Sequence, residues 1–125
     1  THLDHAFEGI RLWQLRGVLD PLLTYAVEPH LLMGDFNTHG PTGANSRRLT
    51  PPVVRMLRNK GYVDAYMTAG EGDGGTFPLL WPFRIDYIFV PQIMQPSLLS
   101  CRVLTGKLIE QASDHRPLMA VFDSI

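Results

Sequence analysis

Apolar residues recur at every third or fourth position through the first part of the chain, which is the spacing of one face of an α-helix. Five leucines form this stripe, and they predict a helix over residues 7–26. Pro21 lies late in this segment and is expected to kink or end the helix. Arg11 and Gln14 share a face of it, and we expect their side chains to brace the helix against the ends of neighbouring strands.

A second helix is predicted over residues 51–60, where valine and leucine side chains provide the apolar face. Thr50 is a suitable N-cap, and Pro51 suits the first turn, where a missing N–H costs nothing. Gly61 is a natural stop, since glycine readily adopts the backbone conformation that ends a helix. The preceding residues 38–50 are rich in Gly, Pro, Asn, Thr and Ser, and they predict a loop.

Runs of β-branched and aromatic residues predict the strands. The clearest run is Arg-Ile-Asp-Tyr-Ile-Phe-Val, and a shorter apolar run ends at Gly34. Residues 67–83 are rich in glycine and proline and predict a long loop. Strands are therefore expected over residues 31–33, 84–90, 97–104 and 117–122. Helix, strand, helix and three strands in this order indicate a mixed α/β fold.

The composition narrows the class of protein. The chain has 125 residues, 45% of them hydrophobic and 18% charged, which is typical of one globular domain. Its formal net charge of −1 excludes a polybasic binder of nucleic acids or membranes, but not an enzyme that acts on a few phosphates. The single cysteine, Cys101, excludes an intrachain disulfide framework. The sequence shows no transmembrane run and no signal peptide, and it leaves the compartment open.

Basic residues cluster around the second predicted helix. The simpler interpretation is a solvated helix face, and the alternative is a surface that contacts phosphates. The cluster consists of Arg47, Arg48, Arg55, Arg58 and Lys60.

Polar side chains with catalytic chemistry interrupt or follow the apolar strands at four places. Strand ends of an α/β sheet are where ligand sites gather, so we expect these side chains to lie together. Carboxylates hold a hard cation such as Mg²⁺, and an amide or imidazole donates to phosphoryl oxygens as charge develops, so the set suits phosphoester hydrolysis. Its members are His2, Asp35, Asn37, Asp86, Asp114 and His115.

Three segments resemble signature motifs of the endonuclease/exonuclease/phosphatase superfamily, which includes DNase I, abasic-site endonucleases, neutral sphingomyelinases and inositol polyphosphate 5-phosphatases. They are Gly34-Asp-Phe-Asn37, Arg84-Ile-Asp-Tyr-Ile-Phe89 and Ser113-Asp-His-Arg-Pro117. Thr1-His-Leu-Asp4, followed by Arg11 and Gln14, resembles the strand-and-helix segment of the family, and Thr76-Phe-Pro78 resembles the segment before its third motif. The resemblance covers residues 1–122 and implies a DNase I-like α/β/β/α sandwich.

The resemblance also implies a role for each residue of the set. Asp35 is expected to activate the attacking water, and Asn37 to bind the scissile phosphate. Asp86 is expected to hold the ring of His115 in one tautomer, while His115 contacts the phosphate. His2 is expected to be a second imidazole on the phosphate side, with an acid role.

The resemblance implies a divalent cation as cofactor, Mg²⁺ first and Mn²⁺ as the alternative. Asp114 is expected to lie at the metal, directly or through water, and Asp35 is its second carboxylate. A phosphoester is the implied substrate. The balanced charge favours a small-molecule or lipid-like phosphoester over long duplex DNA, and a nuclease acting on DNA or RNA is the alternative.

The family pattern is only half present. Members are typically twice as long, and their N-terminal half supplies an Asn and a metal-binding Glu that have no counterpart here. Residues 1–125 are therefore expected to be the C-terminal half of such a domain, one β-sheet with its helices, whose partner is the N-terminal half. The missing Glu leaves a second hypothesis open, in which the chain is a non-catalytic remnant or binding module.

Overall fold

The computed structural model describes residues 1–25, 27–43, 49–79 and 82–123, and it has the mixed α/β architecture that the sequence predicts. Its helices are α1 (Glu8–Leu22), α2 (Pro52–Asn59), α3 (Ala65–Ala69) and α4 (Lys107–Ala112), with 3₁₀ turns at Leu23–Tyr25 and Gln92–Ser97. Its strands are β1 (Leu32–Gly40), β2 (Tyr62–Asp64), β3 (Gly70–Glu71), β4 (Phe77–Pro78), β5 (Pro82–Pro91), β6 (Leu98–Val103) and β7 (Leu118–Phe122).

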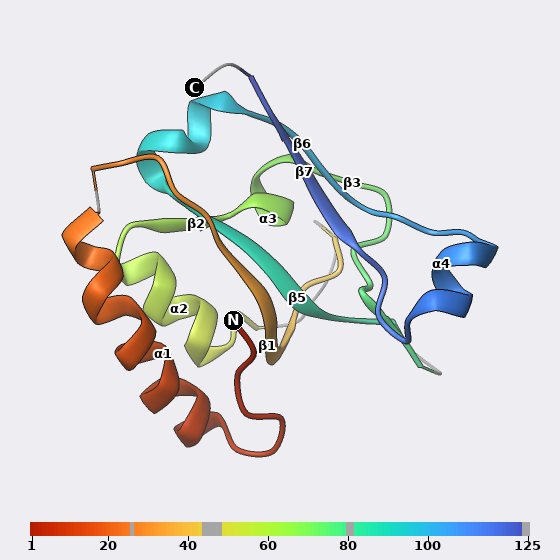
Figure 1. The fold of residues 1–125 in the computed structure, drawn as a ribbon, viewed down its shortest axis with the longest axis horizontal. Coiled ribbons are helices and arrows are strands. Elements are labelled where there is room, and N and C mark those ends of the chain that lie inside the picture. The colour runs from red at the N-terminus through yellow and green to blue at the C-terminus, as the bar shows by residue number, and fades with distance from the viewer. Residues whose placement is uncertain (26, 44–48, 80–81, 124–125) are drawn as a thin grey trace.

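The strands form two sheets, so the expectation of a single sheet is wrong. One sheet has the order β1-β5-β2, with the short β4 paired to β5, and the other has the order β3-β6-β7. The curved strands β1 and β5 run antiparallel through the middle of the molecule (Figure 1), with Leu32 opposite Phe89 and Asp35 opposite Asp86. This register places two acidic residues side by side on neighbouring strands.

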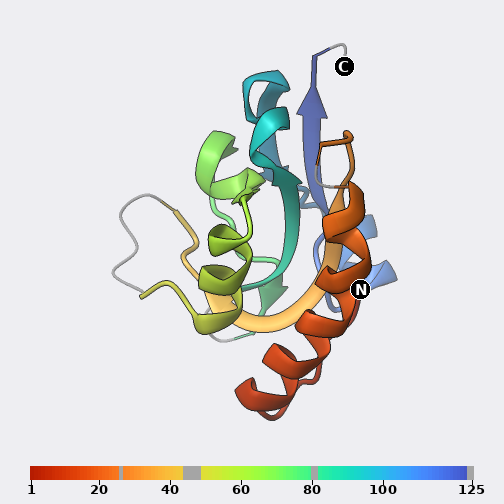
Figure 2. The same cartoon turned by 90° about the vertical axis from the view of Figure 1, so that its left-hand side faces the viewer.

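Helices α1 and α2 cover one face of the β1-β5-β2 sheet (Figures 1 and 2). Aromatic side chains of the sheet interlock beneath them, since the ring of Phe36 meets those of Tyr87 and Phe89 edge-on at 5.5 and 5.1 Å. Burial of this apolar surface is the main force that holds the helices to the sheet. The helices contribute Leu15, Leu19, Val53, Val54 and Leu57 to this core.

Alternate positions of β5 face a second core on the opposite side of the sheet. Ile88 and Val90 pack there with Met94, Leu98 and the buried Cys101. Burial raises the pKa of the Cys101 thiol to about 11, so this cysteine stays protonated and acts as a small apolar residue. Successive residues of a strand point to opposite faces, so Asp86 lies on the face away from α1 and α2.

The predicted helices and the later strands are confirmed with small shifts at their ends. Helix α2 has Pro51 at its N-cap position and Pro52 in its first turn, so the expected capping by Thr50 is wrong. Gly61 follows the helix with a φ of +82°, which is the left-handed stop expected of it. Helix α1 includes Pro21 and continues as a 3₁₀ turn to Tyr25, which agrees with an ending near Pro21.

Two predicted loops are partly wrong. Strand β1 continues to Gly40, well past the expected end at Met33, because Asp35 and Asn37 are part of the strand rather than a turn after it.

The segment 67–83 contains the end of α3, all of β3 and β4, and the start of β5. Three of its described glycines, Gly70, Gly74 and Gly75, are closely packed, and a Cβ at Gly74 would press against the ring of Tyr66. Residues 44–48, with Arg47 and Arg48, lie outside the described residues.

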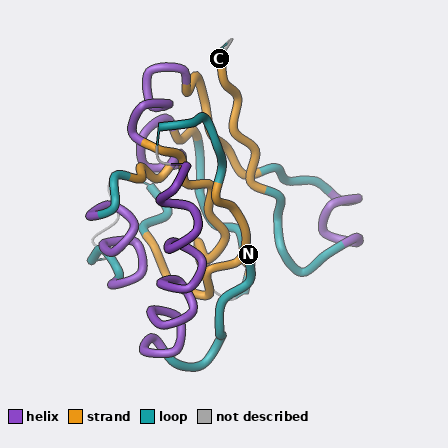
Figure 3. Tube along the Cα trace, turned by 60° about the vertical axis from the view of Figure 1, so that its left-hand side comes forward, coloured by secondary structure: helices purple, strands orange, loops and turns teal. Residues whose placement is uncertain are grey.

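Strand β2 and helices α3 and α4 have no counterpart among the predicted elements. Asp64 begins α3, because its carboxylate accepts hydrogen bonds from the backbone N–H groups of Tyr66 and Met67 at 3.0 and 3.3 Å. Helix α4 stands apart from the layer of α1 and α2 (Figure 3). Among the described residues, no helix is long and apolar enough to span a membrane.

A buried ion pair joins β5 to the end of β2 and to the residue that follows β1. The guanidinium of Arg84 donates to both carboxylate oxygens of Asp64, at 3.0 and 2.7 Å, and its Nε donates to the carbonyl of Pro41 at 2.6 Å. The side chains of Arg84 and Asp64 are 0% and 4% exposed. The guanidinium also lies 4.4 Å from the ring centre of Tyr87, so its charge is met on several sides.

We predict that Arg84→Met lowers the free energy of unfolding by about 3–5 kcal/mol, because it leaves the Asp64 carboxylate buried without its partner. Urea unfolding followed by circular dichroism measures the loss. The matched control is Arg102→Met, at an exposed arginine on β6. The double variant Arg84→Met/Asp64→Leu should regain much of the lost stability, since both charges are then absent. A single-variant loss no larger than that of the control contradicts the role of the ion pair.

Candidate active site

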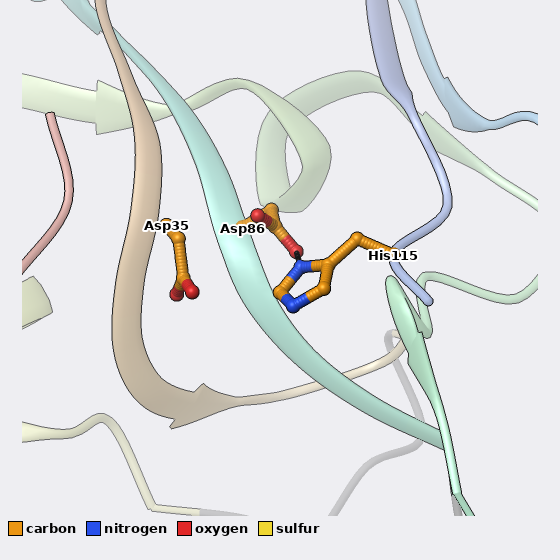
Figure 4. Close-up of side chains that lie close together, drawn as sticks. All are labelled: Asp35, Asp86 and His115. Atoms are coloured by element: carbon orange, nitrogen blue, oxygen red, sulfur yellow. Dashed lines mark hydrogen bonds and ion pairs between the residues drawn. The ribbon is translucent and has the colours of Figure 1, made fainter. Parts of the chain in front are cut away.

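Three titratable side chains from separate parts of the sequence gather on one face of the β1-β5-β2 sheet. Asp35 comes from β1, Asp86 from β5, and His115 from the loop that leads into β7 (Figure 4). Each offers one ligand atom, and these atoms all lie within 4.8 Å of one another. All three residues are partly buried, so the group is held by the fold and still reachable from solvent.

The imidazole of His115 is oriented by Asp86. Its Nδ1 lies 2.8 Å from the Asp86 carboxylate, and the other ring nitrogen points away from Asp86 (Figure 4). A carboxylate at Nδ1 favours the tautomer with the proton on that nitrogen, which leaves Nε2 for another partner. The ring of Phe77 lies 4.9 Å from the imidazole and limits its rotation. The contact expected between Asp86 and His115 is therefore present.

Thr76 holds the backbone beneath this pair, although sequence reasoning gave it no role of its own. It is fully buried, and its hydroxyl oxygen accepts hydrogen bonds from the N–H groups of Ile85 and Asp86, both at 3.2 Å. Its carbonyl accepts from the N–H of Arg116 at 2.7 Å, one residue beyond His115. Thr76 thus links the backbone positions that present both members of the pair. The sequence feature that pointed to Thr76 was the resemblance of residues 76–78 to a family segment.

Asn37 adopts a left-handed backbone conformation with a φ of +48°, which is uncommon for a residue with a side chain. Its N–H donates to the carboxylate of Asp35 at 2.7 Å, and its side-chain amide donates to the carbonyl of Leu3 at 2.8 Å. These bonds compensate the backbone cost and fix the Asp35 carboxylate. The structure therefore brings Asn37 beside Asp35.

His2 approaches Asp35 from the N-terminal segment. Its Nε2 lies 3.5 Å from the carboxylate, and its side chain is 74% exposed. The segment pairs with β1, since the N–H of Leu3 donates to the Asp35 carbonyl at 2.9 Å. Gly34 makes this pairing feasible, because a Cβ there would overlap the backbone carbonyl of Thr1.

Arg11 and Gln14 do brace α1, although against the N-terminal segment rather than against the end of a strand. Arg11 donates to the carbonyl of Asp4 at 3.0 Å, and the side chain of Gln14 accepts from the N–H of Asp4 at 2.7 Å. The pKa of the Asp4 carboxyl lies below its usual value, chiefly because the N–H of Phe7 donates to the carboxylate. Helix α1 thus holds the segment that carries His2 against the sheet.

A cavity of about 330 Å³ opens beside Asp86 and His115. Met33, Ile88 and Leu118 provide its apolar part, so it offers space next to the reactive groups. Arg116 also lines it, and within the described part of the chain the Nε of Arg116 is buried with no hydrogen-bond partner. Its terminal nitrogen pairs with Glu110 at 3.1 Å.

The donor set fits a small divalent cation. The carboxylates of Asp35 and Asp86 offer the oxygen ligands that Mg²⁺ and Mn²⁺ take, with water free to complete the shell, and an imidazole nitrogen suits Mn²⁺ better than Mg²⁺. Asp114 is exposed and lies outside this three-residue group, so its place at a metal stays a prediction. Asp86, for which no metal role was expected, belongs to the group.

Solved structures contain this fold as part of a larger domain. The chain matches a mannosyl-6-phosphatase from Bacteroides thetaiotaomicron with a TM-score of 0.67 and 26% identity, over 97% of this chain and 49% of that one. It matches an endonuclease/exonuclease/phosphatase family protein from the same organism with a TM-score of 0.68 and 25% identity, over 98% and 49%. The chain has the fold of the C-terminal half of an endonuclease/exonuclease/phosphatase domain.

These matches confirm the resemblance to the endonuclease/exonuclease/phosphatase superfamily and the DNase I-like fold class. They also support a phosphoesterase-like fold. The chain spans about half the length of both solved structures, covering 49% of each. No protein-family model and no curated protein sequence matches the chain.

We predict that Thr76→Val disturbs the Asp86–His115 pair, because the N–H groups of Ile85 and Asp86 then lose their shared acceptor. Stability should fall by about 1–3 kcal/mol for each N–H left without a partner. The imidazole ¹⁵N signals of His115, followed by NMR, should shift as well. Thr76→Ser keeps the hydroxyl and should preserve these signals. Unchanged His115 signals in Thr76→Val would show that Thr76 has no positioning role.

Proposed function

We propose that this chain carries reacting residues of a metal-dependent phosphoester hydrolase. The observation that supports it is the gathering of Asp35, Asp86 and His115, the last two of which line a cavity, in a fold whose solved neighbours are phosphatase-family proteins. Acid, base and hydrogen-bond donor then lie within reach of one phosphoryl group.

Each side chain has a task that its contacts permit. Asp35 orients the attacking water and takes its proton, since Asn37 and His2 hold its carboxylate in one place. Asn37 contributes an amide beside that carboxylate to bind the phosphate. When His115 is doubly protonated, it donates from Nε2 to a phosphoryl oxygen while its Nδ1–H stays on the Asp86 carboxylate. His2 is exposed next to Asp35 and supplies a proton on that side.

Electrostatics favour a cation in this site. Two carboxylates close together repel an anionic phosphate, so substrate binding requires a compensating positive charge. Asp35 and Asp86 are the carboxylates within reach of one ion, and Asp114 is proposed to join through water. We propose Mg²⁺, with Mn²⁺ as the alternative. When bound, the cation neutralises charge on the phosphoryl oxygens.

The proposed substrate is a small phosphoester, and a sugar phosphate is the first choice. One solved neighbour is named a mannosyl-6-phosphatase, and the cavity of about 330 Å³ suits a small molecule. The net charge of −1 disfavours long duplex DNA, and a nuclease is the alternative. The chain spans half of its solved neighbours, so we propose the other half of the domain as the partner that completes the site.

Metal binding is testable without turnover. We predict that Mn²⁺ added to the chain broadens the backbone NMR signals of Asp35 and Asp86 first, because a paramagnetic ion relaxes the nuclei nearest to it. Asp35→Asn should weaken this broadening by about tenfold in Mn²⁺ concentration, the scale of one lost ligand interaction. The control is Glu28→Gln, at an exposed carboxylate outside the site. Broadening that spreads evenly over the exposed acidic residues contradicts a metal site here.

Turnover tests the reaction itself. We predict that mannose 6-phosphate releases phosphate in the presence of Mg²⁺ and that EDTA abolishes the release. Asp35→Asn and His115→Ala should each lower turnover at least about a hundredfold, the scale of acid–base and electrostatic roles. The control is His5→Ala, at an exposed histidine.

The assay uses the longest form of the protein that its gene encodes. Near-normal turnover in either site variant overturns the assignment, and faster cleavage of a DNA duplex favours the nuclease. No release from either substrate, together with no Mn²⁺ binding, supports the non-catalytic alternative.

A further inference from the structure

A groove lies between α1 and α2, with a volume of about 590 Å³. This volume lies in the range of binding sites, although the proposed catalytic role makes no use of the groove. Side chains of both helices line it, so its shape is set by the packing of α1 on α2.

The rim of the groove is positively charged. Arg16 of α1, Arg55 of α2 and Lys60 just after α2 line it, and Asp20 is the single carboxylate among the lining residues. All three cations are exposed, and the described part of the chain provides no ion pair for any of them. Arg11, Arg84 and Arg116, by contrast, pair with carboxylates of the chain itself. A local excess of positive charge on a chain of net charge −1 favours an anionic partner.

The floor of the groove is apolar. Leu19 is 2% exposed at its base, and Leu12 and Met56 are partly buried there, next to the main core. An apolar floor between basic walls matches a segment with apolar side chains on one face and acidic side chains beside them. Methionine adapts its shape to such a segment because its side chain is unbranched and flexible.

We propose that this groove binds an acidic amphipathic segment of a partner protein. A lipid bilayer fits less well, because membrane binding uses apolar side chains that protrude, whereas Leu12, Leu19 and Met56 are recessed. A nucleic acid fits less well too, because its backbone needs a row of cations rather than an apolar floor. The basic residues that cluster in the sequence do not form one surface in the structure. Arg55 and Lys60 line the groove, whereas Arg58 lines another cavity.

The groove and the active-site residues lie on opposite sides of the sheet. Phe36 and Tyr87 point toward the helices, whereas Asp35 and Asp86, their neighbours along the strands, point the other way. A segment in the groove therefore leaves the cavity beside His115 open. This inference does not rest on the proposed hydrolase activity and is testable without substrate.

The probe is a fluorescein-labelled synthetic helical peptide with leucines at positions i, i+4 and i+7 and glutamates flanking them. We expect it to bind the full chain at low salt, more weakly at high salt, and to perturb amide NMR signals of α1 and α2. A peptide with glutamines in place of the glutamates should bind at least about tenfold more weakly, because the charge attraction is lost.

Charge reversal in the chain locates the site. Arg55→Glu/Lys60→Glu should weaken binding of the acidic peptide at least about tenfold, measured by fluorescence anisotropy. The control is Arg102→Glu/Lys107→Glu, the same change at exposed residues outside the groove. Equal losses in both double variants, NMR shifts away from α1 and α2, or no binding at low salt overturn the proposal. Tighter binding of phosphatidylserine vesicles or of a DNA duplex through the same residues overturns the choice of a protein partner.

Discussion

The buried pairing of Arg84 with Asp64 is the constraint on which the rest of the fold depends. It joins the end of β1, through the Pro41 carbonyl, to β5 and to the start of α3. Two charges this deep are costly unless every hydrogen-bonding group is met, and here Pro41, Tyr66 and Met67 share in meeting them. Such a pair tolerates few alternative arrangements of the three segments.

The same ion pair helps to hold the backbone of the candidate site in place. Asp86 lies two residues after Arg84 on the same strand, so the ion pair that anchors β5 also limits the movement of the Asp86 backbone. Thr76 adds a second anchor through its hydroxyl, and Asn37 fixes the opposing Asp35. In the proposed hydrolase, side chains supported in this way would lose little orientational freedom on substrate binding, which lowers the entropic part of a barrier.

Sequence patterns predicted what depends on local spacing. The leucine stripe gave α1, the aromatic run gave β5, and polar residues within apolar strands marked Asp35 and Asp86. Local patterns failed where tertiary contacts decide the structure. The Gly-rich segment 67–83 forms short elements because Tyr66 packs closely against Gly70 and Gly74, and Pro82 against Gly75. No periodicity in the sequence indicates such contacts.

Local sequence patterns also did not predict the ion pair between Arg84 and Asp64. Arg84 lies two residues from Asp86 in the sequence, yet it pairs with Asp64, a residue twenty positions away that the sequence did not single out. The two residues carry no motif of their own, and only the fold brings them together. The contact of Asp86 with His115 was accessible because family motifs, rather than spacing, pointed to it.

Because side chains alternate between the two faces of β1 and β5, the register of these strands decides both the packing of the core and the position of the two carboxylates. If the two strands formed with β1 turned by one residue, Asp35 would enter the aromatic core and Phe36 would lie on the face that carries Asp86 and His115. The desolvation of that carboxylate and the loss of the Phe36 contacts would both penalise the slipped state. The register that fills the aromatic core is therefore also the register that places Asp35 beside Asp86. A compact state with the shifted register is strongly disfavoured.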